Sequence, residues 1–521
     1  MRKYLLLLFL FPIVFVFSQQ REFIEGKLVD RKTKEPIAFG TIRVKNKAKG
    51  VISNLDGSFK IPMVFQEIGD TLQISSLGYR TKEVVLSDLK VSDIVVIGLV
   101  EEIEQLTGVV ITGEKTRVTP FSARKIIRKA ISNIPNNYPF FDFSLVGYYR
   151  DYQLKDENYL NLNEAVLEVF DRGFGFKDSY ETMTRIYRYN QNKDFVRDSI
   201  ASKPYNYDDK SKVIHKATLY NPGGNEFALL RVHDAIRNYN VNTYSFVNNL
   251  ERDFEENHNF YLEPDTFIDD IPLYVIRVTK EHKETVVEGK IYISKNDFAI
   301  HKIAYAVHQQ AIIANKENEK WRLSQVAPTK KLGELIFDVN VEYRRYNKEM
   351  YLNYISFRNK FVVKEPPKFM ISSVEVNNES RCFEVNFNNT PSLSSANKKA
   401  KYKLSHKGKR LKIDRISIKN NSAFLYPSNK NLPMGVGDDQ IKFDLKIKNI
   451  KDVDGNELDK FTFYQAYQFR EFFVQEIRPK GKPPKDNLFM VMDRPVFKNQ
   501  PLVKIESLDD YWMNTPLQRN R

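Results

Sequence analysis

The chain has 521 residues, 42% of them hydrophobic and 13% aromatic, and it carries a formal net charge of +15. Its single cysteine, Cys382, excludes an internal disulfide framework, so ordinary hydrophobic cores must hold a chain long enough for three or four domains. The basic balance favours anionic surfaces, such as lipid head groups, lipopolysaccharide or acidic polysaccharide, as partners.

Residues 1–18 are predicted to be a cleavable signal peptide. A basic MRK start precedes an uncharged apolar run over residues 4–17, and the small residues Val16 and Ser18 occupy the −3 and −1 positions. The run is shorter than the roughly 20 residues of a membrane span, with an uncleaved anchor helix as the alternative. We therefore expect export to the periplasm, the outer membrane or the cell surface, no transmembrane span after cleavage, and no nucleic-acid partner.

Residues 23–100 predict a small β-sandwich. Six or seven short strand-like runs are separated by turns, and no helix pattern interrupts them. In the run 37–45, alternation places Ile42 and Val44 on one face of the strand and Thr41 and Arg43 on the other.

Two turns in this sandwich depend on glycine. Asp56 and Gly57 lie between the strand-like runs 50–53 and 58–62, which predicts a β-hairpin. Gly78 is expected to relieve a bulge or corner before the next strand. We assign Asp56, Gly57 and Gly78 a structural role, because no second carboxylate or base accompanies Asp56.

The motifs EGKLVD, EPIAFGTIRVK, GVISNLDGSFKI and SSLGY together resemble the carboxypeptidase-regulatory-like domain, a transthyretin-like sandwich common in secreted proteins of the Bacteroidota. The resemblance implies an appended module. The metal ligands of carboxypeptidases are not expected here, because no HExxH or comparable cluster of ligands occurs among the seven histidines.

Residues 101–140 predict a linker strand followed by an amphipathic helix. The segment 106–115 resembles the strand that follows this module in outer-membrane receptors. Thr119 and Pro120 are expected to begin the helix, and Pro135 and Pro139 to end it. We expect its apolar face to pack on a sheet, with a membrane-surface helix as the alternative.

Residues 141–364 predict a large central antiparallel β domain. The strand-like runs 143–152, 163–170, 272–280, 285–294, 298–307, 334–346 and 354–364 alternate with period two and are in part joined by short polar turns. The segment VEGKIYISKNDFAIHKIAYAV resembles a strand pair of the half-barrel that carries lipoproteins in the Gram-negative periplasm. If the sheet is curved, its concave face could hold an acyl chain; if it is flat, it packs on the helix.

Residues 366–477 predict a second β domain, entered through a hinge at Pro366-Pro367. Its strand-like runs and the turn KDVDGNE resemble a bacterial Ig-like module. Residues 478–521, rich in proline, are expected to form an extended tail that wraps back on the other domains.

One basic cluster suggests a binding surface for anionic lipid or glycan. The segment 398–415 contains one acidic residue and nine cations, which are Lys398, Lys399, Lys401, Lys403, Lys407, Lys409, Arg410, Lys412 and Arg415. On a hairpin, alternation would place several of them on one face. The alternative is a solvated surface without a partner.

No nucleophile, phosphate-binding or metal-binding motif occurs, so we expect no cofactor, no metal site and no catalytic residues. Cys382 lies in a strand pattern and is expected to be buried. The expected function is a secreted, non-catalytic envelope binding or scaffold protein, whose partner is an envelope protein or an anionic surface. The alternatives are a periplasmic lipid or lipoprotein carrier that uses the central sheet, and a hydrolase with convergent acids such as Asp265, Asp269 and Asp270.

Overall fold

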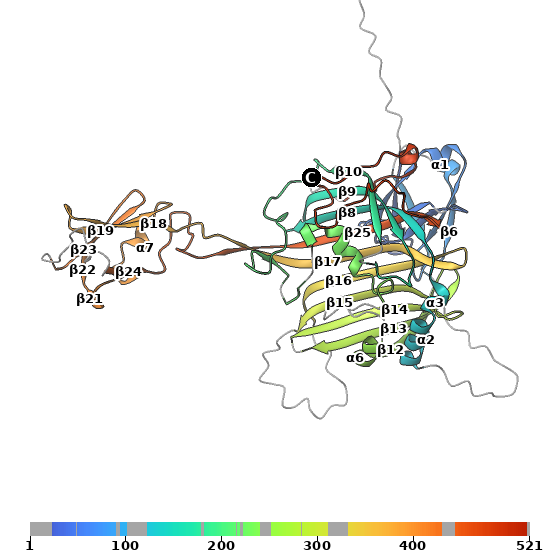
Figure 1. The fold of residues 1–521 in the computed structure, drawn as a ribbon, viewed down its shortest axis with the longest axis horizontal. Helices are drawn as coiled ribbons and strands as arrows, with labels where there is room; N and C mark the ends of the chain where they lie inside the picture. Colours follow the sequence, from blue (N-terminus) through green and yellow to red (C-terminus); the bar gives the residue numbers. More distant parts are fainter. Residues whose placement is uncertain are drawn as a thin grey trace, which may run out of the picture. The chain divides into compact units, whose positions relative to one another are not determined.

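The computed structural model in Figure 1 describes residues 23–47, 49–89, 94–101, 122–178, 182–214, 216–218, 222–239, 252–282, 284–310, 332–429 and 443–517. The predicted signal peptide, the segment 106–115 and Thr119 lie outside these residues. The fold is mainly β, as predicted, and divides into two compact units. The first unit comprises residues 1–197, 219–359 and 468–521, and the second comprises 198–218 and 360–467.

The N-terminal part of the first unit is the predicted sandwich. One sheet has the order β4(Ser58–Pro62)-β1(Phe23–Asp30)-β7(Val95–Leu99), and the other β3(Gly50–Ile52)-β2(Thr41–Val44)-β5(Thr71–Ser75)-β6(Lys82–Val85). Two short helices, α1(Val64–Glu67) and η1(Leu86–Asp88), complete it. Ile42 and Val44 are buried in the core between the sheets, which confirms the predicted alternation along β2.

The expected hairpin at Asp56-Gly57 is wrong, although the turn itself is present. β3 pairs with β2 and β4 pairs with β1, so the chain crosses from one sheet of the sandwich to the other at this point. Gly57 has φ +78° and donates its N–H to the Asn54 carbonyl at 2.9 Å. Gly78, with φ +79°, forms the predicted corner, and its N–H reaches the Phe267 carbonyl at 3.3 Å.

The large sheet of the first unit contains the predicted central strands. Its order is β10(Met183–Gln191)-β9(Asn158–Asp171)-β8(Phe143–Lys155)-β25(Thr462–Pro479)-β17(Glu349–Glu365)-β16(Leu332–Tyr346)-β15(Ile300–Gln310)-β14(Thr285–Ser294)-β13(Ile271–His282)-β12(Asn259–Ile268), and β11(Lys212–Val213) also pairs with β17. Strands β12 to β17 form an antiparallel meander in chain order, as predicted. β25 separates this meander from β8, β9 and β10.

The two small sheets of the second unit lie between β17 and β25 in the chain. One sheet has the order β18(Ile371–Asn377)-β19(Cys382–Phe387)-β23(Ser422–Pro427)-β22(Ile413–Lys419), and the other β21(Lys409–Leu411)-β20(Tyr402–His406)-β24(Phe443–Ile447). Two short helices, α7(Leu393–Ala396) and η4(Lys399–Lys401), precede β20. Residues 468–477, expected in this domain, instead belong to β25 and the large sheet. The Ig-like assignment stays a prediction.

Further helices of the first unit lie beside the large sheet. Besides the two short helices of the sandwich, the described residues of this unit include α2(Ala123–Ser132), α3(Ile134–Asn137), α5(Glu226–Val232) and α6(Arg252–Asn257), with short 3-10 turns η2(Pro222–Gly224) and η6(Glu506–Asp510). Figure 1 shows α2, α3 and α6 next to strands β12 to β15. Ser122, not Thr119, caps α2 by accepting the N–H of Lys125 at 3.3 Å. The apolar face of α2 is buried, and among the described residues no helix has the length and hydropathy needed to cross a membrane.

Candidate functional site

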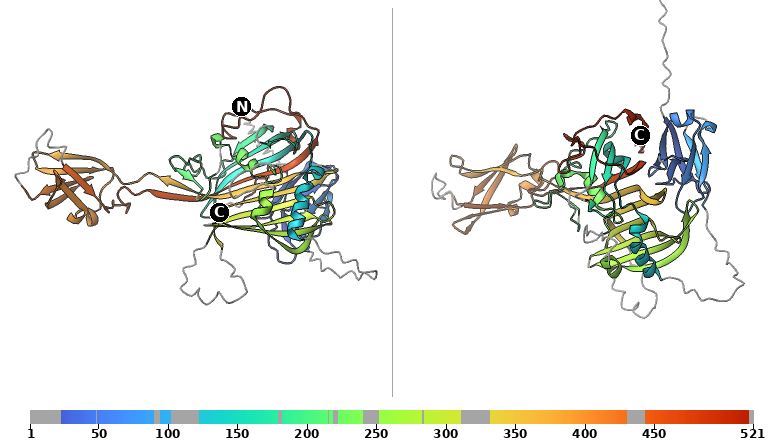
Figure 2. Two further views of the ribbon diagram at one scale, coloured as in Figure 1. Left: turned by 60° about the horizontal axis from the view of Figure 1, so that its bottom comes forward. Right: turned by 45° about the vertical axis from the view of Figure 1, so that its right-hand side comes forward.

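The two faces of the large sheet are covered by different parts of the chain. On β17, the Tyr354 ring stacks on Phe39 of the N-terminal sandwich with centroids 5.0 Å apart, whereas the Phe357 ring stacks on His233, just after α5, at 4.0 Å. An odd spacing along a strand places these two rings on opposite faces. We call the face of Phe357 the helix face and the face of Tyr354 the module face; Figure 2 shows the sandwich, in blue, beside the sheet.

The helix face carries continuous rows of apolar side chains. The strand registers align one row across five strands, Ile276, Ile291, Ile303, Val341 and Ile355, and all five residues are buried. The helices contribute to the cover: Tyr138, at the end of α3, donates its hydroxyl to the Ile300 carbonyl at 2.8 Å. This face therefore has the apolar lining that a lipid site needs, but the chain itself occupies it.

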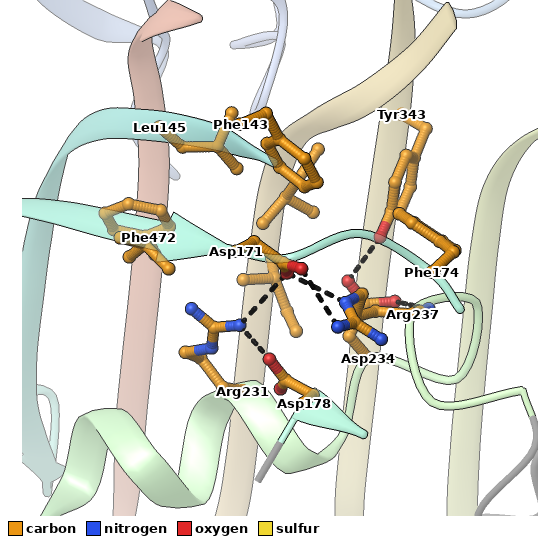
Figure 3. Close-up of a pocket in the computed structure, with 13 residues that line it drawn as sticks. Phe143, Leu145, Asp171, Phe174, Asp178, Arg231, Asp234, Arg237, Tyr343 and Phe472 are labelled. Atoms are coloured by element: carbon orange, nitrogen blue, oxygen red, sulfur yellow. Dashed lines mark hydrogen bonds and ion pairs between the residues drawn. The ribbon is translucent and has the colours of Figure 1, made fainter. Parts of the chain in front are cut away.

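A small cavity remains on the helix face beneath α5. It is lined by Phe143, Leu145, Val169, Asp171, Phe174, Asp178, Arg231, Asp234, Arg237, Tyr343, Leu352, Ile355 and Phe472 (Figure 3). Its volume is about 30 Å³, which is room for roughly two water molecules. An acyl chain does not fit there unless α5 and the segments around it move.

The charged groups of this cavity neutralise one another. Arg237 donates two hydrogen bonds to Asp171, from Nε at 2.8 Å and from Nη2 at 2.9 Å, and Arg231 pairs with Asp178 (Figure 3). Burial would raise the pKa of Asp178, but the nearby arginines hold it below its ordinary value. These ion pairs join the segment around α5 to the sheet.

Asp234 is another buried acid of this cavity, and it accepts the backbone N–H groups of Ile236 and Arg237 at 3.1 and 3.0 Å. Burial raises its pKa to about 6, although Tyr343 donates its hydroxyl to Asp234 Oδ2 at 2.7 Å. Among the cavity residues described here, the acids and arginines are engaged with one another and with backbone groups. That arrangement is typical of a structural ion-pair cluster.

Asp151, a buried acid on the helix face, makes the stability of the fold depend on pH. Burial, with the carboxylate of Glu226 nearby, raises the pKa of Asp151 to about 7. Because the unfolded pKa is near 3.8, the folded state binds more protons between pH 4 and 7, and the contribution of Asp151 to stability falls as the pH rises through that window.

We expect Asp151→Asn to remove this pH-dependent loss of stability. Asn163 and Tyr149, which donate to the carboxylate at 2.8 and 2.9 Å, still meet a polar side chain in the variant. Relative to the wild type, the variant should gain nothing at pH 4 and up to about 4 kcal/mol at pH 8. Urea denaturation across this range measures the difference, and a constant offset between the two curves would contradict the assignment.

The module face is polar where it meets the C-terminal tail. Arg150 and Glu471 form an ion pair with exposed side-chain fractions of 0% and 1%. The backbone carbonyl of Asn514, in the tail, lies 3.4 Å from Arg150 Nη1. Thr515 donates its hydroxyl to Glu164 at 2.9 Å. The tail thus fills the space above a layer of buried charges, as its expected wrapping back implies.

The basic cluster lies on the second unit. Eight of the nine cations are exposed, and Lys401 is half-buried. The expected hairpin is present as β20 and β21, with Ser405 opposite Arg410. Lys403 stands opposite Lys446 of β24, so these two cations share the outer face of that sheet. Arg415 lies on β22, 4.0 Å from the Tyr426 ring, and so belongs to the other sheet.

The three acids considered for a hydrolase do not converge on a pocket. Asp265 pairs with Lys295, Asp269 pairs with Arg43, and Asp270 is exposed in the β12–β13 turn. Within the described ranges, no group of three His, Cys, Asp or Glu side chains is placed to hold a metal ion. Cys382 is buried in β19, as predicted.

Residues 24–111 match the CarboxypepD_reg-like domain family, which confirms the resemblance of the N-terminal module. No curated protein matches the chain. Two solved structures are similar to 46% of this chain. The first is a LolA superfamily protein from Nitrosomonas europaea, which is 12% identical in sequence to this chain. The alignment covers 86% of that protein and has a TM-score of 0.18. The second is a DUF1329 family protein from Desulfovibrio piger, which is 8% identical in sequence to this chain. The alignment covers 87% of that protein and has a TM-score of 0.22.

Proposed function

We propose that this protein is an exported, non-catalytic binding or scaffold protein of the cell envelope, built around a CarboxypepD_reg-like module. The observation that carries the proposal is the large sheet, whose helix face is filled by the chain's own side chains and whose module face holds the sandwich and the tail. The signal-like N-terminus and the single cysteine support export.

The second candidate function is a lipid or lipoprotein carrier. The apolar row from Ile276 to Ile355 favours it, because such a lining would accept an acyl chain if α2 and α5 moved aside. Native mass spectrometry of the protein purified from an envelope fraction distinguishes the two. A clean mass of the chain is the result we expect, and a co-purifying lipid would replace the scaffold proposal by the carrier.

The binding surface we propose for anionic lipid or glycan is the basic cluster of the second unit. Each cation near an anionic membrane contributes about 1 kcal/mol. Reversing Lys407, Lys409 and Arg410 to Glu is therefore expected to weaken sedimentation with phosphatidylglycerol vesicles at least tenfold at low salt.

The matched control reverses Arg31, Lys32 and Lys34, three exposed cations of the N-terminal sandwich, and changes the net charge by the same amount. We expect this control to bind nearly as well as the wild type. Equal losses in both variants would mean that net charge, and not the basic cluster, governs binding, and unchanged retention of the first variant would reject the surface.

A further inference from the structure

A second cavity lies within the first unit, between the N-terminal sandwich and the module face. Its walls come from β2 and β5 of the sandwich, the β12–β13 turn, and strands β15, β16 and β17. The volume is about 250 Å³, against about 30 Å³ for the cavity beneath α5. This is the larger of the two spaces and is enough for a small molecule.

The alternation of the strands makes this cavity polar. On β2, Thr41 and Arg43 point away from the sandwich core, and their cross-strand partners on β5 are Ser75 and Gln73. All four residues line the cavity from the sandwich side. Two of these side chains bond across the boundary: Thr41 accepts the Asn353 amide at 3.1 Å, and Arg43 pairs with Asp269.

Three arginines contribute to the cavity wall, and one of them, Arg345, pairs with Asp297 outside the lining. Arg43, Arg344 and Arg345 line the cavity together with the acids Asp269 and Glu342. Burial, with Arg43 nearby, lowers the pKa of Arg344, and burial lowers the pKa of His301 to about 4, so this imidazole adds no charge at neutral pH.

Both acids of the wall are already engaged. Asp269 pairs with Arg43 at 2.6 Å and accepts the Thr81 hydroxyl at 3.2 Å. Glu342 accepts the Asn353 amide at 3.0 Å and lies 3.6 Å from Lys302 Nζ. Arg43 keeps a buried Nε without a hydrogen-bond partner among the described residues. Arg43 therefore keeps one buried donor for an incoming acceptor.

We propose that this cavity binds a small oxyanionic ligand, through a phosphate or carboxylate group held by Arg344 and Arg43 between the sandwich and the large sheet. The planar guanidinium group matches both anions with paired hydrogen bonds. Because the site has walls from the sandwich and from the sheet, the bound ligand stabilises their association. This inference goes beyond the scaffold proposal and does not depend on it.

Inorganic phosphate and acetate, titrated separately to about 20 mM at constant ionic strength, test the proposal through the thermal unfolding temperature of the full chain. A site saturates with ligand, whereas general exclusion of phosphate from the protein surface does not. We expect a saturable rise with at least one of the two anions, which also identifies the preferred group. No saturable rise with either anion would overturn the proposal.

Arg344→Met should reduce the saturable rise at least fivefold. The control Arg277→Met changes a partly exposed arginine of β13 outside the cavity lining and should leave the rise unchanged. Ser75→Leu fills the cavity without a change of charge and provides an independent loss of binding if Arg344→Met does not fold. Equal rises in the wild type, Arg344→Met and Ser75→Leu would place the effect elsewhere on the surface and reject the site.

Discussion

Replacing Glu471 with Gln is expected to lower the free energy of unfolding of the first unit by about 3–5 kcal/mol, among the largest effects of any single substitution in this protein. Arg150 and Glu471 are fully buried on the module face, and the ion pair compensates the cost of removing both charges from water. The variant leaves the Arg150 guanidinium charged and without its carboxylate. In the wild type, Arg150 Nη2 already has no hydrogen-bond partner among the described residues.

Two comparisons separate this effect from a general loss of charge. Glu83→Gln disrupts the exposed pair of Lys45 and Glu83, whose side chains are 42% and 47% exposed, and should cost less than about 1 kcal/mol. The double variant Arg150→Met/Glu471→Leu should recover most of the loss, because no unpaired charge remains. Urea denaturation followed by circular dichroism measures all three. A loss below 1 kcal/mol in Glu471→Gln would mean that water reaches the pair.

The meander of the large sheet was predictable because its strands alternate with period two and follow one another closely in the chain. The runs 272–280 and 285–294 match β13 and β14 within two residues at each end. The outward orientation of Thr41 and Arg43 was predictable for the same reason. Nothing in the local sequence, however, indicates that the outer face of β2 meets another sheet. The sequence therefore does not distinguish the arginines of the second cavity from ordinary surface charges.

β25 was missed because its partners are far away in the chain. Its aromatic content favours a strand, but the adjacent charges Arg470 and Glu471 argue against burial on both faces. Each charge is compensated from another segment: Arg470 pairs with Glu226 on one face, and Glu471 pairs with Arg150 on the other. Local pattern cannot show a pairing across about 240 or 320 residues, so the strand and the domain boundary at 477 were misjudged together.

The C-terminal tail is the other long-range feature, and Trp512 is its anchor. The indole is 2% exposed and belongs to the core of the N-terminal sandwich, where its ring centroid lies 6.0 Å from that of Phe65. Its Nε1 donates to the Lys60 carbonyl at 2.8 Å. Gln475 of β25 holds the Trp512 backbone, with Nε2 donating to its carbonyl at 2.7 Å. One residue thus links the sandwich, the tail and the sheet.

Trp512→Ala is expected to cost about 3–5 kcal/mol, because it leaves a cavity in the sandwich and removes the donor to the Lys60 carbonyl. Met492→Ala, a change at an exposed tail position, is the control and should stay within about 0.5 kcal/mol. Hydrogen exchange gives a local readout, since the Lys60 N–H donates to Asn514 Oδ1 at 2.9 Å and should exchange faster once the tail detaches. If Trp512→Ala unfolds like the wild type and the Lys60 amide stays protected, the tail is not part of the sandwich core. If both change together, the C-terminal segment is the element that completes the N-terminal module.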